Sequence, residues 1–173
     1  WSDAVIFCNR LSVVRGLTPV YHVKADSFYR LIVNLNFTAD GFRLPTESEW
    51  EYAARAGRDL PFAGGQRARD VAWTNWSSHK QSHPVGQKRP NHWQLHDMSG
   101  NVAEWCSDIA VSYEQRPYIS RDPFYDALIG YRVIRGGSWA CSAHLCRVSS
   151  RGSAPPEARG PDIGLRVLRR LDV

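Results

Sequence analysis

Residues 135–166 are the part of the sequence that most constrains the fold. This segment is long and rich in small residues, and it lacks the apolar periodicity of a helix or a strand. Loops of such length in a compact domain are usually either functional or disordered. Large or charged side chains recur along it, which is unlike a flexible linker: Trp139, Cys146, Arg147, Arg151, Glu157 and Arg159. We therefore expect an ordered, functional loop.

The composition indicates one globular domain over residues 1–173. A chain of 173 residues can bury a sizeable core, and a 12% aromatic content with seven tryptophans argues against disorder. Trp50, Trp93 and Trp105 are expected in the core or the framework. The net charge of +5 is spread along the chain rather than gathered in a basic stripe, so we expect no nucleic-acid partner. No apolar run is long enough to predict a transmembrane segment.

Two helices are expected near the N-terminus. Ser2 and Asp3 can cap a first helix with an apolar stripe, and Gly16 can end it. For the second helix, Thr46 and Glu49 have the spacing of a capping box, in which each side chain accepts a hydrogen bond from the other residue's backbone N–H. Both helices precede the loop-rich remainder of the chain.

The remainder of the chain predicts short strands separated by long loops. Extended or alternating character marks residues 17–23, 31–37, 83–86, 132–135 and 163–168, and residues 95–108 form a turn that feeds a strand. Helices followed by short strands indicate an α+β fold with little regular structure.

Several phrases together resemble one known family. They are GFRLPTESEWEYAARAG (41–57), HPVGQKRPN (83–91), HDMSGNVAEW (96–105), RVIRGGSW (132–139) and IGLRV (163–167). In this order they resemble the formylglycine-generating enzyme (sulfatase-modifying factor) family, from residue 1 to about 168, with the family's N-terminal part missing. The resemblance implies a C-type lectin-like fold with short antiparallel strands. It does not settle function, because the family mixes oxidases with members that lack this chemistry.

The resemblance implies a structural calcium site at the turn of residues 97–104. Its ligands would be the Asp97 and Glu104 carboxylates and the carbonyl oxygens of Gly100 and Val102, which are the hard oxygen ligands that calcium prefers. Alternatively, the two carboxylates cap the turn and pair with nearby arginines. A second family calcium site would fall at residues 73–82, where there is no carboxylate, and we expect no ion there.

The resemblance also implies a catalytic alternative at Cys141 and Cys146. Active members have two cysteines with this spacing after the GGS phrase, and two thiolates suit Cu(I) in an oxidase that converts a substrate cysteine to formylglycine. In active members, however, the segment that follows is longer than the one after Cys146. On that register Cys146 is a buried framework residue and Cys141 has no matched partner. Our hypothesis is that the chain is not an oxidase.

A second resemblance concerns variation in the tail. Residues 135–166 resemble the variable region of proteins diversified by retroelements, some of which share this fold, including a treponemal variable surface lipoprotein. Mutation of adenines in codons that end in C excludes Met, Trp, Lys, Gln and Glu. By register, the candidate variable positions carry none of these: Ala140, Cys141, Ser142, His144, Leu145, Ser150, Gly152, Ser153, Ala154, Pro155, Ala158, Gly160, Pro161 and Asp162. Trp139 and Glu157, which are excluded types, fall on framework positions.

These patterns favour a ligand-binding display domain whose framework holds a variable loop. Trp139, Arg147, Arg151, Glu157 and Arg159 are expected to hold the loop through buried stacking and ion pairs. The ligand would be a protein or a cell-surface molecule, bound through solvent-exposed positions. The resemblance places such a domain on a bacterial cell surface, lipid-anchored through the missing N-terminal part, and we expect a monomer. The alternatives are a copper-dependent oxidase and a non-catalytic accessory domain.

Overall fold

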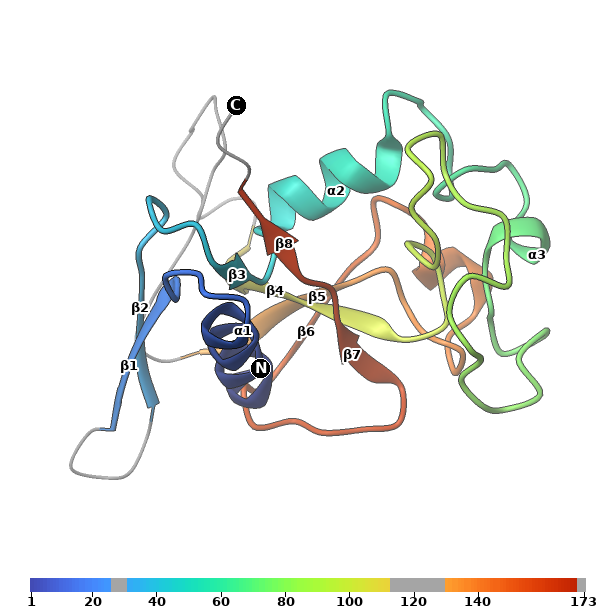
Figure 1. Ribbon diagram of the computed structural model, residues 1–173. Coiled ribbons are helices and arrows are strands. Elements are labelled where there is room, and N and C mark those ends of the chain that lie inside the picture. Colours follow the sequence, from blue (N-terminus) through green and yellow to red (C-terminus); the bar gives the residue numbers. More distant parts are fainter. Residues whose placement is uncertain (26–30, 113–129, 171–173) are drawn as a thin grey trace.

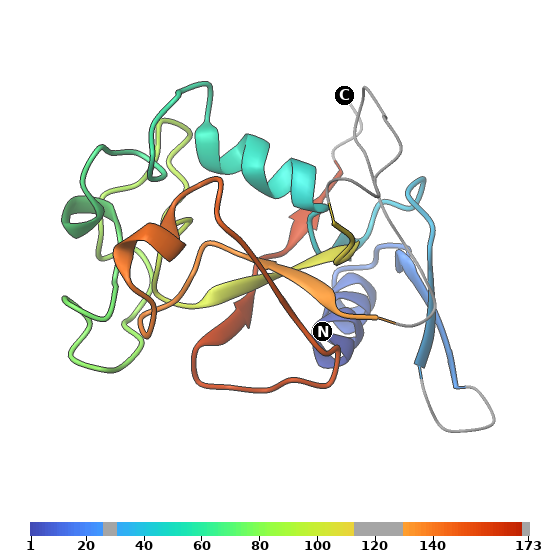
Figure 2. The ribbon, with the colours of Figure 1, turned by 180° about the vertical axis from the view of Figure 1, so that it is seen from behind.

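The structure is a computed structural model that describes residues 1–25, 31–112 and 130–170. Short elements and long loops surround a central sheet (Figures 1 and 2). In chain order the elements are α1 (Ser2–Val14), β1 (Tyr21–Ala25), β2 (Leu31–Leu35), β3 (Phe42–Arg43), α2 (Glu47–Arg55), α3 (Ala68–Val71), β4 (Ala103–Ile109), β5 (Arg132–Arg135), the 3₁₀ helix η2 (Ala143–Cys146), β6 (Arg151–Ala154), β7 (Ile163–Leu165) and β8 (Leu168–Arg169). The α+β class is confirmed.

The central sheet has four strands in the order β6-β5-β4-β7, and β1-β2 and β3-β8 form two small antiparallel pairs. Strand β4 pairs antiparallel with β5 but parallel with β7. Four of the five strand pairs in the described part of the chain are antiparallel, as expected, and the β4-β7 pair is parallel. The connection from β6 crosses below the sheet from one edge strand to the other, so β7 runs beside β4 in the same direction (Figure 2).

The two expected helices are present, and the capping box of α2 is confirmed. Thr46 Oγ1 accepts a hydrogen bond from the backbone N–H of Glu49 at 3.2 Å, and Glu49 Oε2 accepts from that of Thr46 at 2.8 Å. Gly16 follows α1 with a φ of 68°. The proposed cap of α1 was wrong: Trp1 is the N-cap, because its buried indole donates to the carbonyl oxygen of Cys106 and fixes the start of the helix one residue earlier.

Two strand predictions needed correction, and one strand was missed. Residues 83–86 form no strand, because the backbone N–H and carbonyl groups of His83 bond to the side chain of Asn101 instead of to a neighbouring strand. The extended segment 163–168 divides into β7 and β8, which belong to different sheets. Strand β6 was not expected. Its residues show no apolar alternation, and it exists because it pairs with β5.

The core consists of clusters of buried apolar side chains on either side of the sheet. One combines α1 with the strands around it and includes Val5, Tyr21, Leu44 and Trp105. Another lies between α2 and the sheet and includes Trp50, Met98, Cys106, Val133 and Val148. Trp50 and Trp105 are in the core as expected, whereas Trp93 is 46% exposed and meets Tyr52 edge to face. In the described part of the chain, no helix is long and apolar enough to cross a membrane.

Candidate ligand-binding site

Residues 135–166, which we call the tail, begin at the end of β5 with a turn that requires glycine. Gly136 and Gly137 have φ values of 87° and 66°, in the left-handed region that other residues rarely adopt. A Cβ atom at Gly137 would lie 2.6 Å from the carbonyl oxygen of Leu145 and 2.8 Å from Sγ of Cys146. The missing side chain therefore lets η2 pack directly against the start of the tail.

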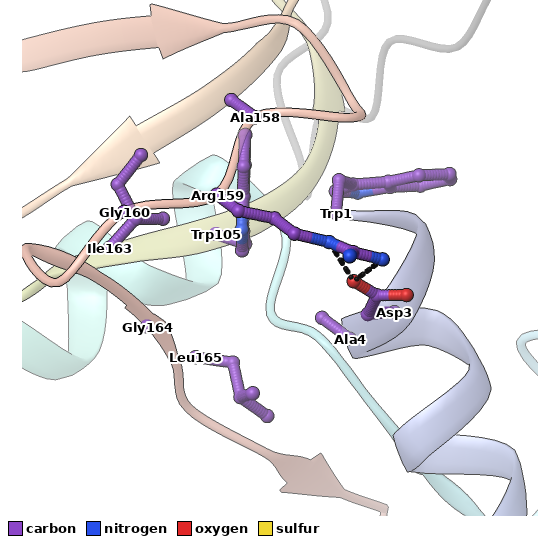
Figure 3. Close-up of a pocket in the computed structure, with 10 residues that line it drawn as sticks. All are labelled: Trp1, Asp3, Ala4, Trp105, Ala158, Arg159, Gly160, Ile163, Gly164 and Leu165. Atoms are coloured by element: carbon purple, nitrogen blue, oxygen red, sulfur yellow. Dashed lines mark hydrogen bonds and ion pairs between the residues drawn. The ribbon is translucent and has the colours of Figure 1, made fainter.

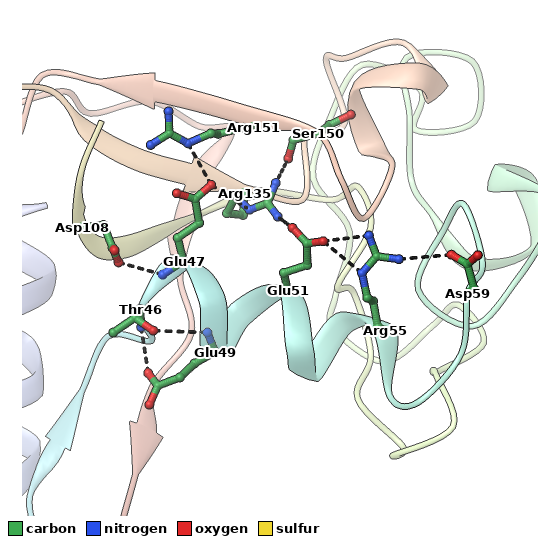
Figure 4. A network of polar contacts seen from close by, with 10 residues as sticks. All are labelled: Thr46, Glu47, Glu49, Glu51, Arg55, Asp59, Asp108, Arg135, Ser150 and Arg151. Atoms are coloured by element: carbon green, nitrogen blue, oxygen red, sulfur yellow. Dashed lines mark hydrogen bonds and ion pairs between the residues drawn. The ribbon is translucent and has the colours of Figure 1, made fainter. Parts of the chain in front are cut away.

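Two arginines tie the first half of the tail to helix α2 (Figure 4). Arg135 is 1% exposed, forms an ion pair with Glu51 and donates a hydrogen bond to the carbonyl oxygen of Ser150. Arg151 Nε donates to Glu47 Oε1 at 2.8 Å, and Arg135 Nε lies 3.7 Å from the same oxygen. Removal of one partner would leave a buried charge uncompensated. This network therefore makes residues 135–151, which we call the inner half of the tail, rigid.

Backbone groups hold residues 155–162, which we call the outer loop. The carbonyl oxygen of Pro161 accepts a hydrogen bond from Nε1 of Trp139 at 3.2 Å. The carbonyl oxygen of Asp162 accepts one from the backbone N–H of Ala103 at 2.8 Å. Since the backbone makes these contacts, they do not depend on the side chains that the outer loop carries.

The expected framework of five residues is only partly buried. Arg151 pairs with the α2 helix as expected, and Trp139 is half-buried. Arg147, Glu157 and Arg159 are exposed, so the expectation of buried ion pairs was wrong for them. Arg159 pairs with Asp3, but the two side chains are 79% and 66% exposed. Exposed pairs add little stability, and these residues contribute charge to the surface instead.

A pocket of about 180 Å³, which we call the tail pocket, opens between β5, β6 and η2. Ile134 and Gly152 are cross-strand partners in β5 and β6, so the isoleucine faces a position that has no side chain. A Cβ atom at Gly152 would lie 3.0 Å from Cγ1 of Ile134. The glycine therefore opens the pocket. The other residues that line it are Ala103, Gly137, Ser138, Cys141, Leu145, Ser150, Arg151, Asp162 and Ile163.

The candidate variable positions lie mostly at the surface. The exposed ones are Ala140, His144, Leu145, Gly152, Ser153, Pro155 and Pro161, and the half-buried ones are Cys141, Ser142, Ser150, Ala158, Gly160 and Asp162. Ala154 is 8% exposed and packs in the core beside α1, so the expectation of a solvent-exposed position was wrong there. The reason is that β6 pairs with β5 and directs this side chain toward the core.

Cys141 and Cys146 lie together against Ser138. Ser138 Oγ is 3.4 Å from Sγ of Cys141, and Sγ of Cys146 is 3.8 Å from the Ser138 carbonyl oxygen. Cys146 is fully buried, and burial raises the pKa of its thiol to about 12, with the nearby Cys141 acting in the same direction. Metals bind the thiolate. The geometry thus brings both sulfurs to one place, while burial keeps Cys146 protonated.

The expected calcium ligands fit a cation only in part. Asp97 is buried and its Oδ2 accepts from the backbone N–H of Gly86, but Oδ1 has no hydrogen-bond partner among the described residues. That orphaned oxygen suits a hard cation. The Glu104 carboxylate instead accepts hydrogen bonds of 2.8–2.9 Å from Arg166 and from Nε1 of Trp50. Glu104 therefore matches the alternative in which the carboxylate pairs with an arginine.

The remaining expected calcium ligands flank the same turn. Gly100 has a φ of 74°, and a Cβ atom there would lie 2.3 Å from the carbonyl oxygen of Trp73. Val102, Asp97 and Glu104 line one open pocket of about 500 Å³. Three of the four expected residues thus share one surface with Arg166, whereas Gly100 is buried and does not line this pocket.

The loop of residues 73–82, where we expected no ion, packs against the tail. The backbone N–H of Asn75 donates to the Cys141 carbonyl oxygen at 2.9 Å, and Ser78 Oγ donates to that of Trp139 at 3.1 Å. Trp76 in this loop is 90% exposed. Sequence reasoning missed Trp76 as a candidate binding residue. The signal that could have found it is a tryptophan in an otherwise polar segment.

A second pocket of about 260 Å³ lies between α1 and the outer loop (Figure 3). Trp1 lines it from the start of α1 and Trp105 from β4, and Arg159 extends from the outer loop toward Asp3. Ala158 and Gly160, two candidate variable positions, also line it. The candidate positions therefore line two pockets.

Comparison with known proteins gives the class to which this fold and tail belong. A family model described as the sulfatase-modifying factor enzyme 1-like domain matches residues 1–171. The formylglycine-generating enzyme of Streptomyces coelicolor is 37% identical over 153 residues, which is 77% of this chain and 48% of that enzyme. The chaperone protein LppX of Paenibacillus barcinonensis is 31% identical over 199 residues, covering 98% of this chain and 67% of the relative. The chain belongs to the sulfatase-modifying factor family.

Among solved structures, Treponema denticola variable protein 1 superposes with a TM-score of 0.87 and 34% sequence identity. The match covers 96% of this chain and 68% of that protein. Both the family and the resemblance to a treponemal variable protein are thus confirmed. The chain spans about half the length of the Streptomyces enzyme, so the activity of such a whole protein is a matter for proposal.

Proposed function

We propose that this domain is a ligand-binding display domain whose tail is diversified by a retroelement. Its partner is a protein or another molecule of a cell surface, and the domain itself is displayed on a bacterial cell surface as a monomer. The similarity to Treponema denticola variable protein 1 supports this function, because the likeness extends over almost the whole chain.

The division of the tail pocket is the observation that carries the proposal. Some residues that line it belong to the sheet or the framework, among them Ile134, Ser138 and Arg151. Others are candidate variable positions: Cys141, Leu145, Ser150, Gly152 and Asp162. A lining that combines fixed and replaceable residues is what a recognition site needs if its specificity is to change while its fold persists. The exposed Trp76 beside the tail adds a fixed aromatic side chain of the kind that dominates binding energy.

The DNA around the 3′ end of the gene tests this function. The proposal expects a near-copy of the tail's coding segment, with adenines at the candidate variable codons, close to a reverse transcriptase gene. Without such a copy, diversification would be rejected. As a protein-level test, the tail positions of a second natural variant are grafted onto this domain. A changed partner with an unchanged melting temperature supports the proposal, and loss of folding contradicts it.

A copper-dependent oxidase is the second candidate, because the structure brings the sulfurs of Cys141 and Cys146 to one place. These two residues would hold the metal, and bound copper would supply oxygen activation. The high pKa of the buried Cys146 thiol opposes this, since a proton must leave before the sulfur can bind. Anaerobic Cu(I) titration decides between the candidates. Stoichiometric binding that Cys141→Ala abolishes would establish the metal site, and its absence supports the binding domain.

Calcium is proposed as a structural ion only where Asp97 lies. Its unpartnered Oδ1 and the carbonyl oxygens of Gly100 and Val102 would hold the ion, and Glu104 would join them only after releasing Arg166. An ion that binds only the folded state raises the melting temperature. Thermal unfolding in calcium and in EGTA, with Asp97→Asn as the control, checks this. An equal melting temperature in both buffers would exclude the site.

A further inference from the structure

We propose that the tail pocket binds one apolar side chain of a protein partner, with a cationic group of that partner next to it on Asp162. This inference rests on the proposed function and names the ligand chemistry of the same site. It comes from three properties of the pocket, which are its size, its walls and its charge.

The size and walls of the tail pocket suit a leucine or a phenylalanine side chain. Its volume is about 180 Å³, and apolar cavities of roughly 150 Å³ admit molecules the size of benzene. Ile134, Ile163 and Leu145 supply aliphatic surface, and Ala103 and Gly137 keep the space open. An apolar group that enters removes this surface from water, which is the main source of binding energy in such a site.

The charge of the pocket favours a cationic neighbour for that side chain. Two charged residues line it, Arg151 and Asp162. Arg151 is already paired with Glu47 at 2.8 Å. Asp162 accepts only a long hydrogen bond of 3.3 Å from Ser138 Oγ, and within the described ranges no basic side chain forms an ion pair with it. A half-buried carboxylate beside apolar walls attracts an ammonium or a guanidinium group more strongly than one in open water.

Gly152 sets the width of this site. In β6 it faces Ile134, and a Cβ atom there would already lie 3.0 Å from the isoleucine. Any side chain larger than that of glycine at this position would extend into the pocket and reduce its volume. Several of the residues that line the pocket are candidate variable positions, among them Gly152, Leu145, Cys141 and Asp162. Domains with different tails would therefore have pockets of different width and charge, lined by the same sheet residues.

Peptide binding to the full chain tests the inference. The probes are acetyl-Gly-Leu-Lys-Gly-amide and two single replacements, with serine for leucine and with glutamate for lysine. We expect the serine peptide to bind roughly tenfold more weakly, because it buries no aliphatic side chain. The glutamate peptide should also bind more weakly, and Asp162→Asn should remove the difference between the lysine and glutamate peptides. Titration followed by backbone NMR should shift the Gly152 and Leu145 signals.

Matched variants in β6 separate pocket filling from general damage. Gly152→Val should abolish binding of the leucine peptide, whereas Ser153→Val on the opposite face of the strand should leave it unchanged. If Gly152→Val does not fold, the loss of charge preference in Asp162→Asn decides the matter. Equal binding of the leucine and serine peptides, or no binding of any peptide, would overturn the inference. The DNA test of the proposed function is independent of all these outcomes.

Discussion

The two halves of the tail are held by different kinds of contact. The inner half, residues 135–151, depends on buried guanidinium groups that reach the carboxylates of α2 (Figure 4). The outer loop, residues 155–162, depends mainly on backbone carbonyl oxygens that accept hydrogen bonds, and its ion pair between Arg159 and Asp3 is exposed (Figure 3). Side-chain identity therefore matters in the first region and much less in the second.

Under the proposed function, this difference explains how a long loop can stay ordered while many of its residues are replaced. Candidate positions between Arg135 and Arg151 can change because the ion pairs of these two arginines with α2 hold the backbone of this segment in place. Positions in the outer loop can change because the hydrogen bonds to Ala103 and Trp139 come from backbone carbonyl oxygens, and the side-chain contacts of this loop are either long, as at Asp162, or exposed, as at Arg159. Ala154, between the two regions, follows neither rule because its side chain is in the core.

Removal of the buried guanidinium should have the largest effect. Arg135→Met removes the buried cation that pairs with Glu51 and lies beside Glu47. Arg55 and Arg151 still contact these carboxylates, but the buried charge is less well compensated, so we expect a loss of about 3–5 kcal/mol in the free energy of unfolding. Urea denaturation followed by tryptophan fluorescence measures it. A loss below about 1 kcal/mol would mean that the ion pairs do not hold the inner half.

Enlargement of the buried candidate position should have a medium effect. Ala154→Leu forces extra volume into the core beside Trp105, and we expect a loss of about 1–3 kcal/mol. Ser153→Leu is the matched control, since this neighbour is exposed and should change stability by less than about 0.5 kcal/mol. If both substitutions were tolerated equally, Ala154 would return to the set of replaceable positions.

Acid should destabilise the N-terminal end of helix α2 by protonating Glu49. Burial opposes ionisation there, but the Arg43 guanidinium and the capping box hold the pKa of Glu49 below its usual value. Its stabilising contribution is therefore complete above the ordinary pKa of glutamate and is lost as the pH falls through the lowered one. Glu49→Gln should cost about 1 kcal/mol at pH 7 and flatten the decline of melting temperature between about pH 5 and 3.

A matched control for acid is Asp59→Asn, because this carboxylate is fully exposed and its contact with Arg55 is on the surface. Its pH profile should follow that of the unmodified protein. If Asp59→Asn flattened the profile as much as Glu49→Gln does, the decline would reflect general charge rather than the capping box.

The smallest effect is expected in the outer loop. Arg159→Ala removes an ion pair whose two side chains are both largely exposed, so stability should change by less than about 0.5 kcal/mol. The same urea titration used for Arg135→Met gives the comparison directly. A loss of stability as large as that caused by Arg135→Met would show that the two halves of the tail are not held by different kinds of contact.

The sequence predicted local features well, because short-range chemistry determines them. The capping box of α2 depends on Thr46 and Glu49 alone, and the structure confirms it. The strand at residues 132–135 has the bounds that its apolar pattern predicted. Strand β6 was missed, because Gly152 and Ser153 show no pattern and become a strand only through distant pairing with β5.

For the candidate site, the sequence supplied positions but not their contacts. The candidate variable positions can be found from residue types and register, yet burial of Ala154 and exposure of Trp76 depend on packing that no local pattern encodes. Register separated Cys141 from Cys146, whereas the fold brings both sulfurs against Ser138. The partner of Glu104 was foreseen only as an arginine of unknown position, and it is Arg166 from the far end of the tail.

The most direct test is a stability-selected library in which every tail residue is varied singly on the full domain. Folding should tolerate most substitutions at the exposed and half-buried candidate positions and at Arg159, and it should reject most of them at Arg135, Gly137 and Ala154. Such a map would establish that a few residues fix the fold of the tail while the positions between them can be replaced. Uniform tolerance along the tail, or intolerance concentrated at the exposed candidate positions, would contradict it.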